Sequence, residues 1–532
     1  MRKLLVSALL LMSFYRLMSQ DETQDPYFGE SCTSIMVGKK ATTDGSVITA
    51  HTCDGNYRTW LKMEAAQDHT DTVKNIIYKG KLRTETVWDM RDVTIAGTIP
   101  QVSHTYAFLN TAYPCLNEKQ LAIGETTFVG PDTLVNKNSL FLIEELERIA
   151  LERCDNAREA IRLIGALIKE YGYADWGECI TIADKNEVWQ MEILGEGPVR
   201  KGGVWAAQRI PDDHVGISAN ISRIGRIDRK NKDYFMASDN AEVVAKELGL
   251  WNGEGDFVFW KAYGHRDKPY DIREFHVLST LAPSLGLSMD MPEMPFSVKP
   301  ENKVSLQTIT ELYRANYEGT PYDMTRKVKY IRKKFDENRK PIGEDTVVSP
   351  AANPWITRDA MNTINFIAPG TIEFKRTVSV AWCSYSHVIQ LREWLPDEVG
   401  GVAWFSFDNP GESPRIPIFA GASALPAGFE FCGQKRYRED AAIWSYRKAN
   451  KLATVSWGKT KDIMLENVIS FEEKALKEMP NLEKEVIALK KANKDAEAKT
   501  LVTNYTRDFE ASTRQRWHEL EVKFWEMFGK GF

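Results

Sequence analysis

The sequence predicts an α+β fold built from layers of antiparallel strands and helices. Its β-rich runs occur in pairs joined by turn residues, and two helical segments separate an early set of runs from a later set. Strands followed by a helix pair and then further strands favour α+β layers over a doubly wound parallel sheet, in which strands and helices alternate. The chain contains neither a glycine-rich phosphate loop nor an internal repeat.

A hairpin is predicted at the first pair of runs, 34–39 and 46–51, around the turn Thr43-Asp44-Gly45. Turn-forming residues between two β-rich runs are typical of a hairpin. It carries Cys32 at its start and Asp54 just past its end. Adjacent antiparallel strands lie about 4.8 Å apart, so the two side chains can share one pocket. A carboxylate there can hold an α-ammonium group and orient it toward a thiol; an ordinary turn aspartate is the alternative.

Hydrophobic spacing predicts the elements that follow. The segment 156–171 places apolar residues at helical spacing, and a second helix is expected before it at 139–153. A loop rich in proline, methionine and serine is expected at 285–302. Further strands are expected at 119–125, 179–183, 187–193, 204–210, 215–221, 377–382 and 402–407.

The C-terminal region, 459–532, changes to a helical and charged pattern that Pro480 is expected to interrupt. Its last helix gathers four large apolar residues on one face: Trp517, Leu520, Phe524 and Phe528. Such a face predicts that the helix docks on the body of the protein. A partner-binding arm is the alternative.

Composition excludes several classes of protein. The 532 residues carry a net charge of −5, which rules out a strongly basic nucleic-acid binder. Seven cysteines are an odd number, so at least one thiol has no partner within the chain. The sequence has no Cys-x-x-Cys pair, and its histidines are not spaced as metal ligands are. We therefore expect neither a metal nor another cofactor. The sequence leaves open whether the chain forms a homo-oligomer.

The first residues predict export. Arg2 and Lys3 precede an apolar stretch, 4–15, that is too short to span a bilayer. A basic start, a short apolar centre and a polar exit are typical of a cleaved signal peptide, which we place at 1–20. The acidic segment 21–31 suits a short exposed propeptide. We therefore expect a periplasmic or extracellular protein that makes no membrane contact once the signal is removed.

Cleavage before Cys32 would make this cysteine the first residue of the mature chain. Its free α-amino group would have a pKa of about 7.7–8 and could act as a base beside the thiol. This is the arrangement of an N-terminal-nucleophile amidohydrolase. The alternative is a buried structural cysteine, which is the usual environment of a free thiol.

The run from Cys32 to Ser46, CTSIMVGKKATTDGS, resembles the mature start of the bacterial dipeptidases of the N-terminal-nucleophile superfamily, a family that includes the secernins. The resemblance extends to about residue 430 through 116–127, 189–193, 317–323 and 376–383. It implies a four-layer αββα sandwich over 32–458, followed by the C-terminal helices. It also implies a cysteine peptidase that matures by autoprocessing or by a separate protease.

The resemblance also implies roles for individual residues. Cys32 would be the nucleophile, and Asp54 would bind its α-amine. Asn220 matches a loop asparagine that helps to hold the oxyanion, and the backbone amide of Thr127 would supply a second donor, although the alignment also permits Thr126. Two converging donors make chemical sense because removing one typically costs about 3–4 kcal/mol.

One residue departs from the family pattern. Related enzymes commonly place an arginine three residues before the aspartate, where this chain has His51. A histidine can stabilise a thiolate only when protonated, and its unperturbed pKa is about 6.5. Either His51 takes that role with a stronger pH dependence, or Arg223 or Arg226 fills the space. The third interpretation is a core histidine whose ring is hydrogen-bonded within the protein.

Two enzymatic functions fit these residues. The first is an exported dipeptidase, in which Cys32 forms an acyl-enzyme with a small peptide substrate and water releases the N-terminal amino acid. Such an enzyme must recognise a free ammonium group, and Glu125 is the candidate carboxylate. The second is an acylase of the bile-salt hydrolase or penicillin acylase type, which would need a broad apolar pocket. A non-enzymatic scaffold is a third hypothesis, against which Cys32, Asp54 and Asn220 together argue.

Overall fold

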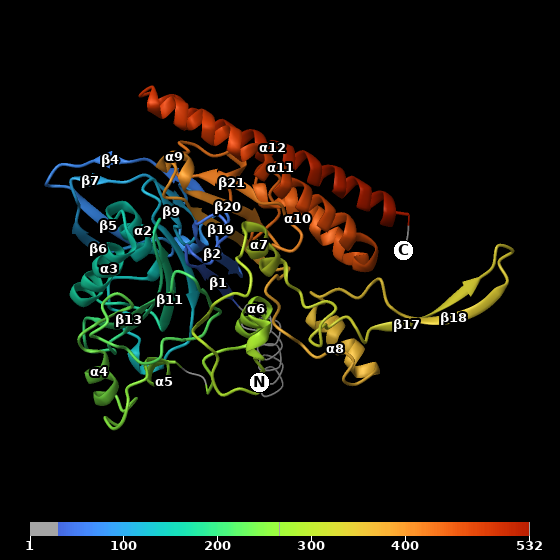
Figure 1. Ribbon diagram of the computed structural model, residues 1–532, viewed down its shortest axis with the longest axis horizontal. Coiled ribbons are helices and arrows are strands. Elements are labelled where there is room, and N and C mark those ends of the chain that lie inside the picture. The colour runs from blue at the N-terminus through green and yellow to red at the C-terminus, as the bar shows by residue number, and fades with distance from the viewer. Residues whose placement is uncertain (1–29, 265–266, 531–532) are drawn as a thin grey trace, which may run out of the picture.

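The computed structural model describes residues 30–264 and 267–530, so the expected signal peptide and nearly all of the expected propeptide lie outside the described residues. Two large antiparallel sheets pack face to face, as Figure 1 shows. The first has the strand order β16 (Ser297–Val298), β14 (Val215–Ser218), β1 (Ser31–Val37), β2 (Val47–Asp54), β19 (Cys383–Leu391), β20 (Val402–Phe407) and β21 (Ile416–Phe419).

The second sheet has eight strands and supplies the opposite wall of the interior. Its order is β15 (Phe235–Ala237), β13 (Gly203–Arg209), β12 (Val188–Gly195), β11 (Gly177–Ala183), β10 (Ala122–Thr127), β9 (Leu116–Asn117), β8 (Phe108–Asn110) and β3 (Lys62–Glu64). β10 contacts both β1 and β2 across the interface between the sheets. This contact brings the start of β1 against the end of β10.

Helices pack against both sheets. α2 (Ile143–Arg153) and α3 (Ala157–Tyr171) lie on the second sheet, where α3 contacts β11, β12 and β13. α10 (Ala442–Ala453) contacts β20, and α12 (Asp495–Phe528) contacts β21 of the first sheet. The mixture of helices and antiparallel sheets confirms the predicted α+β class.

The first hairpin forms as predicted, with β1 and β2 paired antiparallel and Cys32 opposite Cys53. Gly45 adopts φ 87° in the turn, a region that glycine enters without steric cost. The Asp44 carboxylate accepts hydrogen bonds from both the backbone nitrogen and the hydroxyl of Ser46. Every residue of β2 is buried, because β2 lies between β1 and β19 within the sheet and faces the second sheet.

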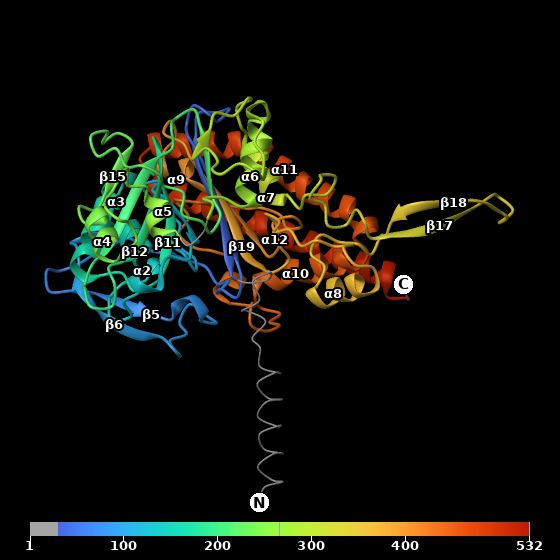
Figure 2. The ribbon, with the colours of Figure 1, turned by 90° about the horizontal axis from the view of Figure 1, so that it is seen from below.

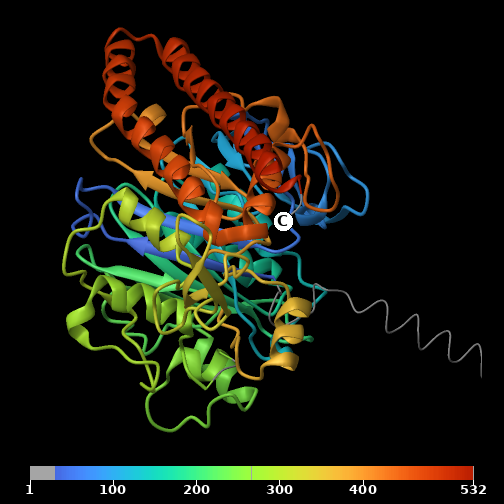
Figure 3. The same cartoon turned by 90° about the vertical axis from the view of Figure 1, so that its right-hand side faces the viewer.

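Figure 3 shows that the C-terminal region forms two long antiparallel helices on one side of the molecule. α11 spans Trp457–Lys491 and α12 packs against it. All four residues of the predicted docking face are buried, which confirms that this face packs on the body: Trp517, Leu520, Phe524 and Phe528. The predicted interruption is wrong, because α11 runs through Pro480. Met479 and Leu482, on either side of Pro480, are buried in the main hydrophobic core, so the helix stays packed through the turn in which proline removes a hydrogen bond.

The predicted strand at 377–382 is also wrong. This segment is irregular, and β19 begins only at Cys383. Ser379 binds the end of α7 (Leu306–Arg314) instead of a neighbouring strand: its backbone nitrogen donates to Ala315 O, and its hydroxyl donates to Arg314 O. The segment therefore crosses the end of the first sheet and carries Arg376 toward Asp54.

Several described elements were not expected from the sequence. Figure 2 shows a hairpin of β17 (Lys329–Phe335) and β18 (Pro341–Val348) that projects from the body beside α8 (Arg358–Ile367). Two further small sheets pair β4 (Gln67–Asp68) with β7 (His104–Thr105), and β5 (Lys74–Lys79) with β6 (Thr94–Pro100). Shorter helices are α4 (Ala241–Glu247), α5 (Phe259–Tyr263), α6 (Ile272–Leu281) and α9 (Asp397–Gly400). Within residues 30–264 and 267–530, no helix combines the length and hydropathy of a membrane span.

Candidate active site

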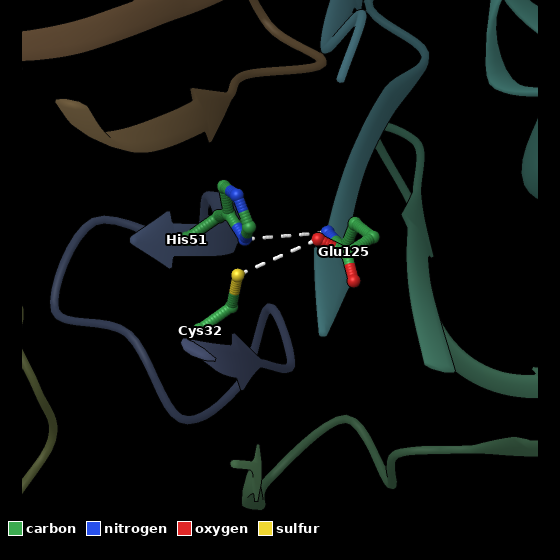
Figure 4. A group of neighbouring side chains, drawn as sticks. All are labelled: Cys32, His51 and Glu125. Atoms are coloured by element: carbon green, nitrogen blue, oxygen red, sulfur yellow. Dashed lines mark hydrogen bonds between the residues drawn. The ribbon is translucent and has the colours of Figure 1, made fainter. Parts of the chain in front are cut away.

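Cys32 lies near the start of β1, in the interface between the two sheets. Its side chain is fully buried, and its Sγ lies 3.5 Å from Oε2 of Glu125 on β10, as Figure 4 shows. Burial raises the pKa of the Cys32 thiol well above its usual value, and contacts with Cys53 and the charge of Glu125 raise it further. A thiol in this environment stays protonated near neutral pH, so its reaction as a nucleophile needs a base beside it.

Asn220 joins Cys32 to the loop that follows β14. Its Oδ1 accepts a hydrogen bond of 2.9 Å from the Cys32 backbone nitrogen. Its Nδ2 donates to the carbonyl oxygen of Thr127 at 2.6 Å. Asn220 has φ 62°, a left-handed conformation that asparagine adopts more readily than most residues and that concentrates at functional sites. The structure thus brings together three of the residues expected in the site, and it is Thr127, not Thr126, that contacts Asn220.

On one side of Cys32, Glu125 shares a hydroxyl group with a second glutamate. The Thr127 hydroxyl lies 2.8 Å from Oε1 of Glu125 and 3.2 Å from Oε1 of Glu178. Burial raises the pKa of Glu125, and burial together with the charge of Glu125 raises the pKa of Glu178 well above its usual range. Burial thus disfavours the charged form of both carboxyl groups, and that of Glu178 more strongly than that of Glu125. Among the described residues, no Lys or Arg forms an ion pair with either carboxyl group.

On the other side of Cys32, Asp54 does have a cation. Its Oδ2 accepts a 2.6 Å hydrogen bond from Arg376, whose guanidinium also donates to the hydroxyl of Ser31. The Thr52 hydroxyl donates to the same Asp54 oxygen at 2.9 Å. Asp54 is fully buried, and its Oδ1 has no hydrogen-bond partner within the part of the chain that the structure describes. Asp54 lies opposite Ser31 in the sheet register, next to the peptide bond that precedes Cys32.

His51 does not act as a cation at this site. It is fully buried, and burial lowers its pKa to about 3 despite the hydrogen bond that Nδ1 accepts from the Glu125 backbone nitrogen. The imidazole is therefore neutral near pH 7. Of the three interpretations, the lowered pKa and the contact of His51 favour that of a core histidine, which here holds the backbone of Glu125.

The two arginines expected near Asp54 lie elsewhere. The guanidinium of Arg223 donates to the carbonyl oxygens of Pro269 and Pro295, and Arg226 pairs with Asp256 at the surface. Both guanidinium groups are thus engaged with other partners, so the structure does not support the alternative in which one of them fills the space of the family arginine.

Sequence reasoning missed three residues that contact Cys32 or the residues around it. They are Arg376, Arg273 and Glu178. Arg273 donates to the Cys32 carbonyl oxygen at 2.8 Å and to Oδ1 of Asn220 at 3.1 Å. Arg376 opens one of the motifs that carry the family resemblance, which was a usable signal. Arg273 and Glu178 reach the site only through tertiary packing, so no local pattern marks them.

Figure 4 also shows the one group among residues 30–264 and 267–530 whose ligand atoms are close enough to hold a metal ion. It consists of Cys32, His51 and Glu125, with one ligand atom from each within 4.8 Å of the others. All three are buried, and the Glu125 amide already engages Nδ1 of His51. The set is therefore better explained as hydrogen-bonded neighbours of a nucleophile than as a metal centre.

A cavity of about 210 Å³ adjoins Asn220. Its walls combine aromatic and aliphatic side chains with small polar groups and one cation: Phe128, Val129, Asn220, Ile221, Ser222, Trp260, Gly264 and Lys268. The volume is slightly larger than the roughly 150 Å³ that holds a benzene ring.

Comparison with known proteins identifies relatives over most of the chain. Residues 31–469 match the model of peptidase family C69. A "Probable dipeptidase" of Latilactobacillus sakei is 26% identical over 422 residues, which cover 74% of this chain and 75% of that protein. A "Probable dipeptidase B" of Streptococcus pyogenes serotype M1 is 23% identical over 483 residues, covering 86% of this chain and 83% of the relative. These matches confirm the resemblance that the motifs predict.

Proposed function

Because the chain belongs to peptidase family C69, we propose that it is an exported dipeptidase whose mature form begins at Cys32. Its two packed sheets with helices against each are consistent with the four-layer αββα sandwich of N-terminal-nucleophile hydrolases. The relatives' names support dipeptide hydrolysis.

The observation that carries the proposal is the buried carboxyl pair Glu125–Glu178, in which Glu125 lies 3.5 Å from the Cys32 thiol and neither group has a cation among the described residues. A buried carboxylate is costly unless a positive charge meets it. The free ammonium group of a dipeptide supplies that charge, and it places the adjacent carbonyl carbon next to Cys32. The carboxylate pair thus explains why a free N-terminus would be required.

The reaction begins with proton transfer within Cys32. Once the Ser31–Cys32 bond is cleaved, the new α-amine takes the proton of the thiol, whose raised pKa prevents it from ionising without a base. The sulfur then attacks the substrate carbonyl carbon. Nδ2 of Asn220 turns from the Thr127 carbonyl oxygen to the developing oxyanion, with a backbone amide near Thr127 as the second donor.

The remaining steps return the enzyme to its starting state. The protonated α-amine gives its proton to the leaving amino group, so the C-terminal amino acid departs and a thioester remains on Cys32. Water, deprotonated by the same amine, releases the N-terminal amino acid. Asp54 would hold the amine in place, because its unpartnered Oδ1 can accept a hydrogen bond from it.

The acylase alternative fits the structure less well. A bile-acid or penicillin-like acyl group needs a broad apolar pocket, and ligand pockets for such molecules typically measure about 300–1,000 Å³. The cavity beside Asn220 has about 210 Å³ and contains a lysine. Its size supports a single amino-acid residue as occupant.

The test combines maturation with activity. Purified exported protein should begin at Cys32 by intact-mass analysis, and it should hydrolyse members of a dipeptide panel but not amide conjugates of bile acids. Cys32→Ala should remove all hydrolysis, whereas the matched buried control Cys115→Ala should retain it. Fully active material that still carries Ser31 would contradict the proposed nucleophile. If Cys32→Ala is nevertheless cleaved before residue 32, a separate protease performs the maturation.

A further inference from the structure

The cavity beside Asn220 has one cationic side chain in its lining, that of Lys268. The Lys268 side chain is exposed, and its Nζ lies 3.1 Å from the carbonyl oxygen of Met289 and 3.4 Å from the hydroxyl of Tyr270. Within the part of the chain that the structure describes, no carboxylate forms an ion pair with Lys268. Two neutral oxygen atoms thus hold the ammonium group at the cavity wall and leave its charge without an opposite partner.

Contacts through Asn220 link the cavity to Cys32 and Glu125. Glu125 is 3.5 Å from the Cys32 thiol, Asn220 accepts a hydrogen bond from the Cys32 backbone nitrogen, and Asn220 also lines the cavity that Lys268 borders. The sequence of chemical groups is therefore anion, nucleophile, oxyanion donor and cation. A dipeptide presents ammonium, scissile carbonyl and carboxylate in the same order, within a length of about 7 Å.

We propose that this cavity binds the C-terminal residue of the dipeptide and that Lys268 pairs with its α-carboxylate. The proposal rests on the proposed function and adds the recognition of the leaving group to it. Trp260 and Phe128 supply an apolar wall for the side chain of that residue.

Size and charge together explain a limit on substrate length. A volume of about 210 Å³ accommodates one residue and not two. In a tripeptide, the group that faces Lys268 would be a neutral peptide carbonyl, and the next residue would extend beyond the cavity. A dipeptide amide separates the effect of the C-terminal charge from the effect of substrate length. It keeps the size of the dipeptide and removes only the negative charge.

The test measures kcat and KM for Leu-Leu and for its C-terminal amide, with the mature enzyme at low and moderate ionic strength. Wild type should prefer the free acid. Lys268→Gln should raise KM for the acid about fivefold, the size expected for one exposed ion pair, and leave the amide unchanged. Lys268→Glu should reverse the preference. Added salt should raise KM for the acid in wild type only, because it screens an exposed charge pair.

Lys261→Gln is the matched control, since this lysine of α5 pairs with Glu293 and does not line the cavity. It should behave as wild type with both substrates. Equal KM values of wild type for acid and amide, or equal losses for both in Lys268→Gln, would overturn the assignment of Lys268 while dipeptide hydrolysis itself stands. Failure of wild type to cleave any dipeptide would instead overturn the proposed function.

Discussion

The two sides of Cys32 each hold a buried carboxylate, but among the described residues only Asp54 has a cation beside it. Asp54 pairs with Arg376 at 2.6 Å, whereas Glu125 shares Thr127 with Glu178 and has no ion pair among the described residues. A charge that the fold neutralises contributes to stability and to orientation. A charge that the fold leaves uncompensated raises the energy of the free protein and is available to a ligand. The difference separates a positioning group from a substrate-binding group.

Removing Arg376 should give the largest change in stability. Arg376→Met leaves Asp54 buried without its cation, so the free energy of unfolding should fall by about 3–5 kcal/mol in urea titrations. Asp54→Asn in the same chain should restore part of this loss, because it removes the unpaired charge. The exposed control Arg226→Met should change stability by less than about 0.5 kcal/mol.

A substitution on the Glu125–Glu178 side of Cys32 should change the free energy of unfolding much less. Glu178→Gln removes a carboxyl group for which residues 30–264 and 267–530 supply no cationic partner, so it should cost less than about 1 kcal/mol of unfolding free energy or stabilise the fold. A loss as large as that of Arg376→Met would show that Glu178 has a structural cation after all.

Asn220→Ala should leave both carboxylates in place and affect turnover. Loss of an oxyanion donor should lower kcat by about 100-fold or more, with little change in the unfolding midpoint. Stopped-assay kinetics with a dipeptide and a thermal melt of the same preparation separate the two effects. Near-native turnover would remove Asn220 from the catalytic site.

Acid pH tests whether His51 could supply the missing cation beside Glu125. Its pKa is lowered to about 3, so between pH 6.5 and 3 the unfolded chain binds a proton that the folded chain does not. The free energy of unfolding should therefore fall as pH falls through this window, by up to about 1.4 kcal/mol per pH unit for this group.

His51→Gln keeps an acceptor for the Glu125 amide and removes the titration. The stability difference between wild type and this variant should therefore change with pH below 6.5 and stay constant above it. Burial also raises the pKa of Glu144, Glu274 and Glu412 to about 8, with the opposite pH trend, but these groups are common to both proteins. A pH-independent difference would mean that His51 titrates normally.

Local patterns were sufficient for much of the fold. The hairpin of Cys32, the helix pair and the docking face of the last helix each follow from spacing and turn residues, which act within a few residues of the chain. In the segment 377–382, valines alternate with polar residues, and this pattern predicts a strand. The segment does not form one, because Ser379 instead binds the end of α7. The projecting hairpin β17–β18 has no buried face, so it leaves no hydrophobic alternation to detect.

The site was predictable where family motifs mark it and not where packing alone creates it. Cys32, Asn220 and Thr127, which the motifs mark, lie together, and Glu125, chosen for its place beside Thr127, lies next to Cys32. The charge partner of Asp54 comes from a residue more than 300 positions away, and Arg223 and Arg226, chosen for their nearness to Asn220, point elsewhere. Nearness in sequence therefore failed as a guide to which arginine approaches a buried carboxylate.

The central claim is that the uncompensated carboxylate beside Cys32 receives the substrate ammonium. The most direct measurement compares kcat/KM of the mature enzyme for a free dipeptide and for its N-acetyl derivative. Acetylation removes the cation, so the account predicts a loss of about 2–5 kcal/mol in transition-state binding. This discrimination should disappear in Glu125→Gln/Glu178→Gln, in which neither side chain can carry the charge. Comparable kcat/KM for the two substrates in wild type would contradict the account and favour an acylase.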